Sequence, residues 1–404
     1  MGISFKALTS QAEIAALEAY WKPHQWNPNA DWDFYHTIIK TRKEVVCPCV
    51  LVAYDGTEIV ALVAGRIEAT SMSFGFGYAK LANLSVRQLV LINGGFIGQW
   101  DPALYRTFMP FLQKFIEEHQ LDLVRISQVR LHAPFHALLI EGPRRQRAIP
   151  EGGEALHWLM RLPATWPEFL QSRSKKHRYW IKRLSNILDR DFPGAWSMQL
   201  HTSPEQSREF LQAAEKIADT TYHRGLGVGI RADEQNLQRL KLEAERGQLR
   251  GYLLTIKEKP CAFWYCSVYG KTLHLCTTGY DSSLRDYELG TVLLMKVFQD
   301  HCGSAIEVVD FGLGDAGYKQ RFGTENYKES SFCLFASTRR GGMLRTAFAM
   351  SAGSNAAARR LLDRLRLTQS LKTFWRQRLA GRKAATVEGS ATTANGQQQK
   401  GDES

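Results

Sequence analysis

The sequence of 404 residues contains no run of eighteen apolar residues, so it lacks a segment typical of a bilayer-spanning helix. Its first residues, MGISFKALTSQAE, also lack the charged-then-apolar order of a secretory signal. We therefore expect a cytoplasmic protein. With 44% hydrophobic residues, the chain is long enough for two domains that each bury a core.

Metal-ligand spacing is also absent from the cysteines. The chain has seven, and neither the Cys47-Pro-Cys49 pair nor the scattered remainder shows the spacing of zinc ligands. An odd number in a long chain also argues against a disulfide framework. We expect buried free thiols and no metal site.

The net charge of +12 is concentrated in one part of the chain. Residues 338–383 hold ten Arg and two Lys against a single Asp, a net of +11, whereas residues 1–337 carry +3 and residues 384–404 carry −2. A nucleic-acid-binding domain would carry this excess on its folded body. The nearly neutral body therefore argues against nucleic acid as a partner.

The basic region is rich in helix formers between residues 355 and 381, whose last residue, Gly381, suits the end of a helix. Two interpretations stay open. The Arg cluster with Phe374 and Trp375 could hold the protein on anionic lipid, at the inner face of a membrane beside a polysaccharide synthase. Alternatively, the region is a solvated helical extension packed on the body. Residues 384–404 are polar and lack aromatics, which predicts disorder.

Two segments show the same order of expected elements. The stretch from Leu89 to Val124 overlays the stretch from Leu273 to Val308 at an offset of about 184 residues, which favours two copies of one α/β unit over a chance match. Each copy consists of a strand pair, a strand, a helix and a strand. The expected ranges are 50–68, 87–98, 103–119 and 122–129 in the first copy, and 251–270, 272–281, 290–302 and 304–312 in the second.

Two helices are expected between the copies. Residues 172–189 have six basic residues before any acid, and residues 204–223 follow Ser203-Pro204, a pair that suits an N-cap and the first helical position. The basic helix is either a solvated face or a source of positive charge for phosphates.

The stretch DFGLGDAGYKQRFGTE, residues 310–325, contains two misleading motifs. Gly312, Gly314 and Gly317 have dinucleotide-binding spacing, but the following helix can extend only from Tyr318 to Phe322, too short for that fold. The opening Asp-Phe-Gly is a kinase triplet without the other kinase motifs. Both matches are therefore coincidental, and what remains is a strand, a flexible turn and a short helix.

This strand, turn and helix, together with GYDSSLRDYELGTVLL at 279–294, resembles the GNAT acetyltransferase superfamily, in its cellulose- or exopolysaccharide-biosynthesis branch. The resemblance covers about residues 165–335. The first half resembles a diverged second copy, as in the Fem-type peptidyltransferases. It implies an α/β, tandem GNAT-like acyl-CoA acyltransferase fold with a mixed central sheet flanked by helices, plus the basic helical C-terminal extension.

In that family the pyrophosphate of acetyl-CoA lies where a strand runs into a helix, on backbone N–H groups at the positive end of the helix dipole. Glycine there allows close approach of the backbone to oxygen atoms. The residues assigned to the cofactor by this resemblance are Leu289, Gly290, Thr291, Arg285 and Thr278.

The match departs from the family pattern at two positions. Tyr287 replaces a basic residue and Val292 a small one, so Arg285 or the cations of 173–183 would have to supply the missing charge. The corresponding turn of the first copy, QWDPALYR, contains no glycine. We therefore expect only the second copy to bind the cofactor.

The resemblance also implies the residues of the reaction. A backbone N–H in the strand from His274 to Gly279 would polarise the thioester carbonyl, and Tyr318 would serve the departing thiolate. Asp310 or Asp315 would act as base or orient the acceptor. An expected alternative for Asp310 is that it caps the glycine-rich turn through its own backbone. We assign Asp310, Tyr318 and Asp315 to catalysis, and His274, Lys319 and Tyr265 to substrate binding.

The expected organisation is a diverged N-terminal GNAT-like domain at 1–160, a GNAT acetyltransferase domain with the cofactor site at 161–337, the basic extension at 338–383 and the disordered tail at 384–404. The expected activity is transfer of an acetyl or other short acyl group from acetyl-CoA to an amine or hydroxyl of a carbohydrate, in surface-polysaccharide biosynthesis. The alternatives are a Fem-like transferase that uses aminoacyl-tRNA, and a catalytically silent scaffold of the same fold.

Overall fold

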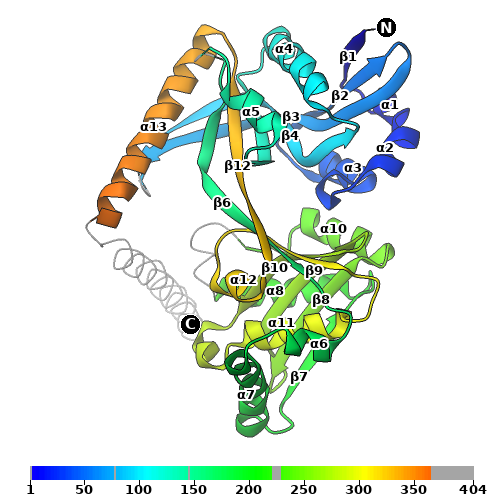
Figure 1. Ribbon diagram of the computed structural model, residues 1–404, viewed down its shortest axis with the longest axis vertical. Helices are drawn as coiled ribbons and strands as arrows, with labels where there is room; N and C mark the ends of the chain where they lie inside the picture. The colour runs from blue at the N-terminus through cyan, green and yellow to red at the C-terminus, as the bar shows by residue number, and fades with distance from the viewer. Residues whose placement is uncertain (1, 77–78, 144–145, 221–228, 365–404) are drawn as a thin grey trace, which may run out of the picture.

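A single sheet of twelve strands runs through the molecule, with helices on both faces (Figure 1). The computed structural model describes residues 2–76, 79–143, 146–220 and 229–364. The strand order is β1-β2-β3-β4-β5-β12-β6-β11-β10-β9-β8-β7. The strands are β1 (Ile3–Leu8), β2 (Val45–Asp55), β3 (Glu58–Phe76), β4 (Ala79–Gly98), β5 (Leu123–Arg130), β6 (Ile149–Arg161), β7 (Trp196–His201), β8 (Leu249–Ile256), β9 (Lys259–Tyr269), β10 (Thr272–Tyr280), β11 (Val308–Leu313) and β12 (Glu325–Phe335).

The helices lie between these strands in a repeated order. In the first half they are α1 (Gln11–Ala15), α2 (Glu18–His24), the 3₁₀ turn η1 (Pro28–Ala30), α3 (Trp32–Thr41), α4 (Pro102–Glu118) and α5 (Pro134–Ile140). In the second half they are α6 (Trp166–Gln171), α7 (Lys175–Asp191), α8 (Ser207–Asp219), α10 (Glu234–Glu245), η2 (Ser282–Tyr287), α11 (Leu289–His301) and α12 (Gly317–Phe322), and α13 (Arg339–Arg364) follows.

The internal repeat predicted from the sequence is confirmed by strand register. In the first copy β4 pairs with β5 in parallel, with Leu89 opposite Val124, and in the second β10 pairs with β11 in parallel, with Leu273 opposite Val309. The offset is thus 184 residues on one strand and 185 on the other. Each parallel pair is joined by one helix, α4 or α11, as a crossover connection requires.

The two copies exchange their last strands. Strand β6, which follows the first copy in sequence, pairs with β11 of the second, and β12, which follows the second copy, pairs with β5 of the first. The exchanged strands pair with each other at the centre of the sheet and form the long ribbons that join the two halves in Figure 1. The predicted boundary after residue 160 falls at the end of β6.

In the second copy, successive side chains along a strand point to opposite faces of the sheet, and each face is covered by its own layer of helices. Trp264 packs with α7 and α11 on one face, whereas its neighbours Phe263 and Tyr265 pack with α8 and α10 on the other. The first copy has α4 and α5 on one face and α1, α2 and α3 on the other. Strands buried on both faces produce the long apolar runs seen in the sequence.

Local signals explain most element boundaries. Gly56 has a left-handed φ of 64° and closes the predicted turn between β2 and β3. Helix α7 starts after Ser174, whose hydroxyl accepts the N–H of His177. The expected cap at Ser203 was wrong: α8 begins at Ser207, because the amide oxygen of Gln206 accepts the N–H groups of residues 202 and 203.

The basic extension begins as α13, which packs its first turns on the body. Leu344 is buried against β3 and β12, and Arg340 forms an ion pair with Asp122 at 2.7 Å.

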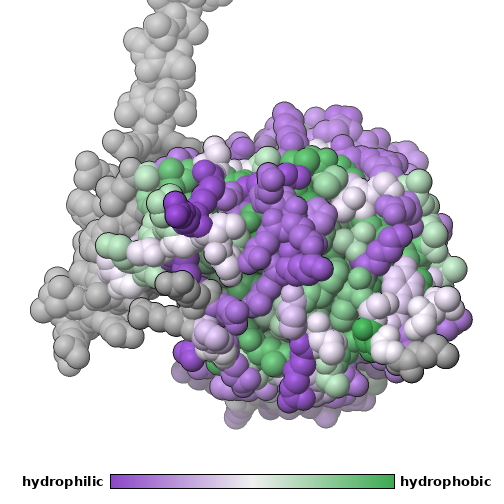
Figure 2. All heavy atoms as spheres, turned by 90° about the horizontal axis from the view of Figure 1, so that it is seen from above, coloured by the Kyte–Doolittle hydropathy of each residue, from purple (hydrophilic) through white to green (hydrophobic). Residues whose placement is uncertain are grey.

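Seen from above, the surface shows a broad hydrophilic area with smaller hydrophobic patches around it (Figure 2). The remainder of the predicted helix after residue 364, Phe374 and Trp375, and the predicted tail at 384–404 lie outside the described residues. No described helix has the length and hydropathy needed to cross a bilayer.

Candidate active site

The candidate site lies where β10 and β11 stop pairing. Their last paired residues are His274 and Asp310, although both strands continue beyond this point. β-bulges distort the outer ladders on either side, between Leu275 and Thr277 and between Asp310 and Gly312. Bulges re-aim side chains and free backbone groups, so the edge of β10 beyond His274 is free of β11.

Asp310 is the centre of a polar network. Its Oδ1 atom accepts hydrogen bonds of 2.7 Å from the Nε2 atom of His157 and from the backbone N–H of Gly312, and its Oδ2 atom lies 3.2 Å from the Nδ1 atom of His274. Burial alone would raise the pKa of Asp310, but its contacts with His157 and His274 outweigh burial and hold that pKa well below its usual range. Asp310 is therefore a stable carboxylate that orients other groups.

His157, on the exchanged strand β6, lies between two carboxylates. Its second nitrogen, Nδ1, is 3.2 Å from Glu329 of β12, and its ring stacks on Tyr327 with centroids 4.8 Å apart. Burial alone would lower the pKa of His157, but the hydrogen bonds to Asp310 and Glu329 raise it to about 9. We conclude that His157 is an imidazolium at neutral pH and that both of its nitrogens are occupied.

His274 differs from His157 because one of its nitrogens stays available. The Nδ1 atom faces Asp310, and within the described part of the chain nothing binds Nε2. Its side chain is 20% exposed. A carboxylate on one imidazole nitrogen fixes the tautomer in which the other nitrogen carries a lone pair, which is the arrangement of a general base.

The glycine-rich turn holds Lys319 beneath the site. Gly312 and Gly314 have φ values of 67° and 105°, which L side chains rarely adopt, and the Nζ atom of Lys319 donates to the carbonyl of Leu313 at 2.5 Å. Burial lowers the pKa of Lys319, against the opposing effect of Asp310. The expected cap from Asp310 to this turn is present as its bond to the Gly312 N–H.

Tyr318 and Asp315 take different places on α12 and its approach. The Tyr318 ring packs edge-on against Trp264 with centroids 5.5 Å apart, and burial raises its pKa above the usual range. No group in the described ranges hydrogen-bonds its hydroxyl. Asp315 is exposed and accepts a bond from Gln320 at 2.5 Å, away from the His274–Asp310 pair. Tyr318 thus packs against the core of the second copy, whereas Asp315 lies at the surface.

Tyr265 is not brought to the site. It is 4% exposed, and its hydroxyl donates to both carboxylate oxygens of Glu243 on α10 at 2.8 Å. Arg239 joins the pair, 2.9 Å from Glu243 and over the Tyr265 ring. This satisfied buried cluster stabilises α10 on the sheet, so the structure gives Tyr265 a packing position instead of the substrate contact predicted for it.

The strand-to-helix turn expected to hold a pyrophosphate leads directly into α11. A Cβ atom at Gly290 would meet only the Tyr280 ring, at 3.7 Å, so the position is open above the helix end. Leu289 is buried, Thr291 is half-buried at the first turn, and the hydroxyl of Thr278 is bonded to the Phe263 carbonyl. Arg285 is 79% exposed and lies 3.8 Å from Asp286.

One acidic residue complicates this turn. Glu288, the residue before α11, has a left-handed φ of 47°, and its carboxylate accepts a bond from the Trp180 indole and lies 3.7 Å from Arg321. Arg321 also stacks on Trp180 at 4.3 Å. A carboxylate at a helix N-terminus stabilises the helix and repels a second anion. The turn is thus open at Gly290, Arg321 lies beside its Glu288, and the negative charge of Glu288 opposes the binding of a phosphate-bearing donor there.

The first copy lacks the corresponding chemistry. With Leu89 overlaid on Leu273, the positions of His274 and Asp310 are held by Val90 and Arg125, and Arg125 is neutralised by Glu151 at 2.7 Å. The start of α4 has Pro102 at its first position and Asp101 capping the Leu104 N–H. These described residues of the first copy thus provide neither a histidine–carboxylate pair nor an open glycine turn at this place, and binding of the cofactor by the second copy only stays a prediction.

Sequence reasoning missed His157 and Glu329. They lie in β6 and β12, 153 and 19 residues from Asp310 in the chain. No local signal distinguishes them, because both strands contain several other polar residues and β6 is mostly half-buried or exposed. Among the described residues there is no cluster of His, Cys, Asp and Glu that could hold a metal. Burial raises the pKa of Cys276, on the bulge of β10, to about 12, which makes a cysteine nucleophile there unsuitable.

Comparison with known proteins identifies the second copy. Residues 175–320 match a family model described as an acetyltransferase (GNAT) domain. No protein with a curated description matches the chain. The solved structure of FemX is similar at a TM-score of 0.52 and 10% identity, over 85% of this chain and 100% of that one.

Two further solved structures are similar over more than four-fifths of this chain. A conserved protein of unknown function from Bacteroides thetaiotaomicron is 14% identical over 82% of this chain and 100% of that one, with a TM-score of 0.49. A tandem GNAT protein from the clavulanic acid biosynthesis pathway is 10% identical over 83% and 99%, with a TM-score of 0.46. At such identities the likeness concerns the fold alone.

Proposed function

We propose that the chain is an acyltransferase whose reaction centre lies at the end of the β10–β11 pair, with His274 as the general base. The observation that carries this proposal is the pairing of His274 with Asp310 through one ring nitrogen, while no residue that the structure describes binds the other. Asp310 is in turn held by His157, so the base is oriented by a second layer of contacts.

The residues of the second copy divide the tasks of acyl transfer among them. His274 removes the proton from an attacking amine or hydroxyl. The backbone N–H groups of β10 beyond the last β11 pair stabilise the negative charge that develops on the carbonyl oxygen. Tyr318 donates a proton to the leaving thiolate. When bound, acetyl-CoA supplies the activated acyl group as a thioester.

Replacement of Tyr318 by phenylalanine is expected to lower kcat by about 10²-fold, in the lower part of the range for general acid catalysis. The ring keeps its contact with Trp264, so stability and donor binding should change little. Thiol release measured under saturating donor, alongside calorimetric donor binding, separates these effects. Wild-type turnover in this variant would remove the Tyr318 hydroxyl from the mechanism.

The donor site is proposed at Leu289, Gly290 and Thr291, with Arg285 and Thr278 nearby. A tryptophan at Gly290 would project into the open space above the helix end without a clash at Cβ. We expect acetyl-CoA to bind the intact protein and its affinity to fall at least tenfold in Gly290→Trp, measured by calorimetric titration at matched salt. Gly153, an exposed glycine of β6 with open surroundings and no left-handed φ, provides the matched control in Gly153→Trp.

The same titration applied to Glu288→Gln tests the charge at the turn. Removing one negative charge at a helix N-terminus favours an incoming anion by about 0.3–1 kcal/mol, so donor binding should tighten about two- to fivefold. Asp286→Gln, an exposed change two residues away, controls for general charge. Equal binding of acetyl-CoA to all variants would contradict a donor site at this turn, and no binding to any would contradict coenzyme A as donor.

We propose a carbohydrate amine or hydroxyl as acceptor, in surface-polysaccharide biosynthesis, on the basis of the sequence resemblance to that branch of the superfamily. An acceptor screen with amino sugars and hydroxyl sugars, read as acceptor-dependent thiol release, tests this class. Release that amines outside the carbohydrate class stimulate equally would contradict it.

A Fem-like activity is the second candidate, because Glu288 opposes a pyrophosphate at the donor turn. In that case the donor would be an aminoacyl-tRNA, and the base and its orienting carboxylate would keep the same roles. Transfer from a charged tRNA in the absence of coenzyme A distinguishes the two donors. A protein that binds neither donor would be a scaffold of the same fold.

A further inference from the structure

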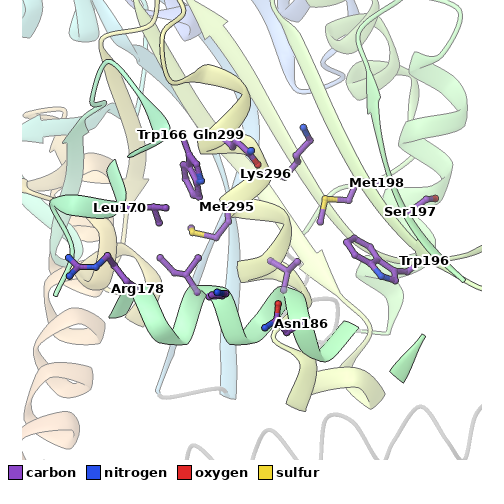
Figure 3. Close-up of a pocket in the computed structure, with 13 residues that line it drawn as sticks. Trp166, Leu170, Arg178, Asn186, Trp196, Ser197, Met198, Met295, Lys296 and Gln299 are labelled. Atoms are coloured by element: carbon purple, nitrogen blue, oxygen red, sulfur yellow. The ribbon is translucent and has the colours of Figure 1, made fainter. Parts of the chain in front are cut away.

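A groove on the second copy lies apart from the candidate active site. Helices α6, α7 and α11 and the edge strand β7 enclose a space of about 750 Å³ (Figure 3). Ligand pockets commonly measure about 300–1,000 Å³. This groove lies on the α7–α11 face of the sheet, whereas His274 and Asp310 alternate with the residues that pack on that face. It therefore does not belong to the acyl-transfer centre.

The floor and walls of the groove are apolar and deformable. In Figure 3 the side chains of Met295 from α11 and Met198 from β7 lie between the indoles of Trp166 and Trp196. The two tryptophans and Met198 are half-buried, so part of their apolar surface faces the open groove. Methionine thioethers adapt their shape to apolar ligands.

The charged residues that line the groove are all basic, and two acidic residues lie beside it: Asp300, which pairs with Lys296, and Asp189, which accepts a hydrogen bond from the Trp196 indole. Arg178 and Lys182, one turn apart on α7, and Lys296 on α11 line it, and no acidic side chain is among the lining residues. Arg178 is engaged with the carbonyl of Arg173, and Lys296 pairs with Asp300 at 2.5 Å. Lys182 is exposed, and no partner for its ammonium group exists within the described ranges. Lys182 is thus the cation available to an incoming anion.

We propose that this groove binds a single-chain anionic amphiphile of the fatty-acid class, with the chain along Met295 and Met198 and the carboxylate at Lys182. An apolar floor next to an unpaired ammonium complements a molecule with one apolar chain and one negative end. A neutral ligand would leave the Lys182 charge unused, and a compact polar ligand would leave the methionine and tryptophan surfaces uncovered. The ligand is recognised as a free molecule.

The apolar contribution predicts a specific dependence on chain length. Each methylene transferred from water to the groove contributes about 0.8 kcal/mol, which corresponds to about fourfold in affinity. Octanoate, decanoate and dodecanoate therefore differ by about 16-fold per step of two methylenes until the groove is filled. Decanol, which has no negative charge, is expected to bind more weakly than decanoate.

The test is calorimetric titration of the full chain with these carboxylates below their micelle concentrations. Lys182→Glu should weaken decanoate binding at least tenfold, and Asn186→Trp, a change at an exposed residue that lines the groove, should abolish it. Lys176→Glu and Arg183→Trp, on exposed positions of the same helix outside the groove, are the matched controls and should bind as the wild type does.

Binding that shows the chain-length series and is lost only in the two groove variants supports the proposal. No binding of any carboxylate, or equal losses in the control variants, overturns it. Binding to anionic vesicles without binding of the monomeric carboxylates would also overturn it, since that result indicates a membrane surface instead of a ligand groove. None of these outcomes depends on acetyl-CoA or on the activity of His274.

Discussion

Replacement of His274 by glutamine is expected to lower kcat by about 10²- to 10⁴-fold, the usual contribution of general acid–base catalysis. Glutamine can still donate a hydrogen bond to Asp310 but provides no basic nitrogen to the acceptor. Donor affinity should stay within about twofold, because the strand-to-helix turn at Gly290 is untouched. Steady-state thiol release with an acceptor from the screen, compared with calorimetric donor binding, gives both quantities.

Two companion variants make this result specific. Asp310→Asn should also reduce kcat, because it removes the carboxylate that fixes the His274 tautomer. His24→Gln, at an exposed histidine of the first copy, should leave turnover unchanged. If His274→Gln retained wild-type turnover, the assignment of the base would be wrong, and a carboxylate or Lys319 would have to take that role.

The His157 network is expected to make the free energy of unfolding depend strongly on pH. The pKa of His157 is raised to about 9 in the folded state, against about 6.5 in an unfolded chain. Its stabilising contribution is therefore fully present below about pH 6.5 and is lost as the pH rises through 9. A difference of this size corresponds to about 3–4 kcal/mol, since each pKa unit is about 1.36 kcal/mol.

The dependence of the free energy of unfolding on pH in acid follows from Asp310. Its pKa is depressed in the folded state, so its contribution is present above its unfolded pKa of about 3.9 and is lost as the pH falls below that value. Urea denaturation at pH 2.5, 6 and 9.5 measures the free energy of unfolding on both sides of the maximum, which is expected near pH 6. Since His157→Gln leaves Asp310 and Glu329 without a cation, it should cost about 3–5 kcal/mol.

Glu329→Gln is the milder variant for the same measurement. Loss of one carboxylate lowers the pKa of His157, so the alkaline loss of stability should begin at a lower pH than in the wild type. Glu325→Gln, an exposed change on the same strand, should keep the wild-type profile. If the free energy of unfolding of Glu329→Gln depended on pH as that of the wild type does, the contacts of His157 would not be the cause of the loss of stability at high pH.

The elements that sequence predicted correctly are those fixed by short-range signals. The turn at Asp55-Gly56, the helix that became α11 and the short helix after Gly317 each depend on residues within one or two turns of chain. The repeat was visible because Leu89 and Leu273 each begin the same succession of strand, helix and strand. Local pattern was therefore sufficient for the order of elements and for the α/β class.

The strand exchange could not be predicted in the same way. Apolar alternation indicates that β6 and β12 are strands. No local feature of β6, which ends at Arg161, shows that its neighbour in the sheet is β11. His157 became part of the site only through this exchange. A pairing between residues 153 positions apart leaves no trace in the spacing of either partner.

The sequence also does not show which face of the sheet a polar residue in a buried strand points to. Trp264, Tyr265 and Cys266 are all buried, so the alternation that normally separates core from solvent is missing in β9. Tyr265 was predicted at the substrate for its chemistry, yet Glu243 on α10 satisfies its hydroxyl. Only the helix packed on that face decides between the two positions.

The exchanged strands also determine when the sheet and the polar network around Asp310 can be completed during synthesis. The first copy leaves the ribosome with β5 lacking its neighbour, because β12 emerges about two hundred residues later. The carboxylate of Glu329 arrives with that same strand and completes the charge around His157. A nascent chain interrupted after residue 320 but before β12 would therefore carry the whole region that matches the GNAT model, yet have an unfinished sheet edge and an incomplete polar network around His157.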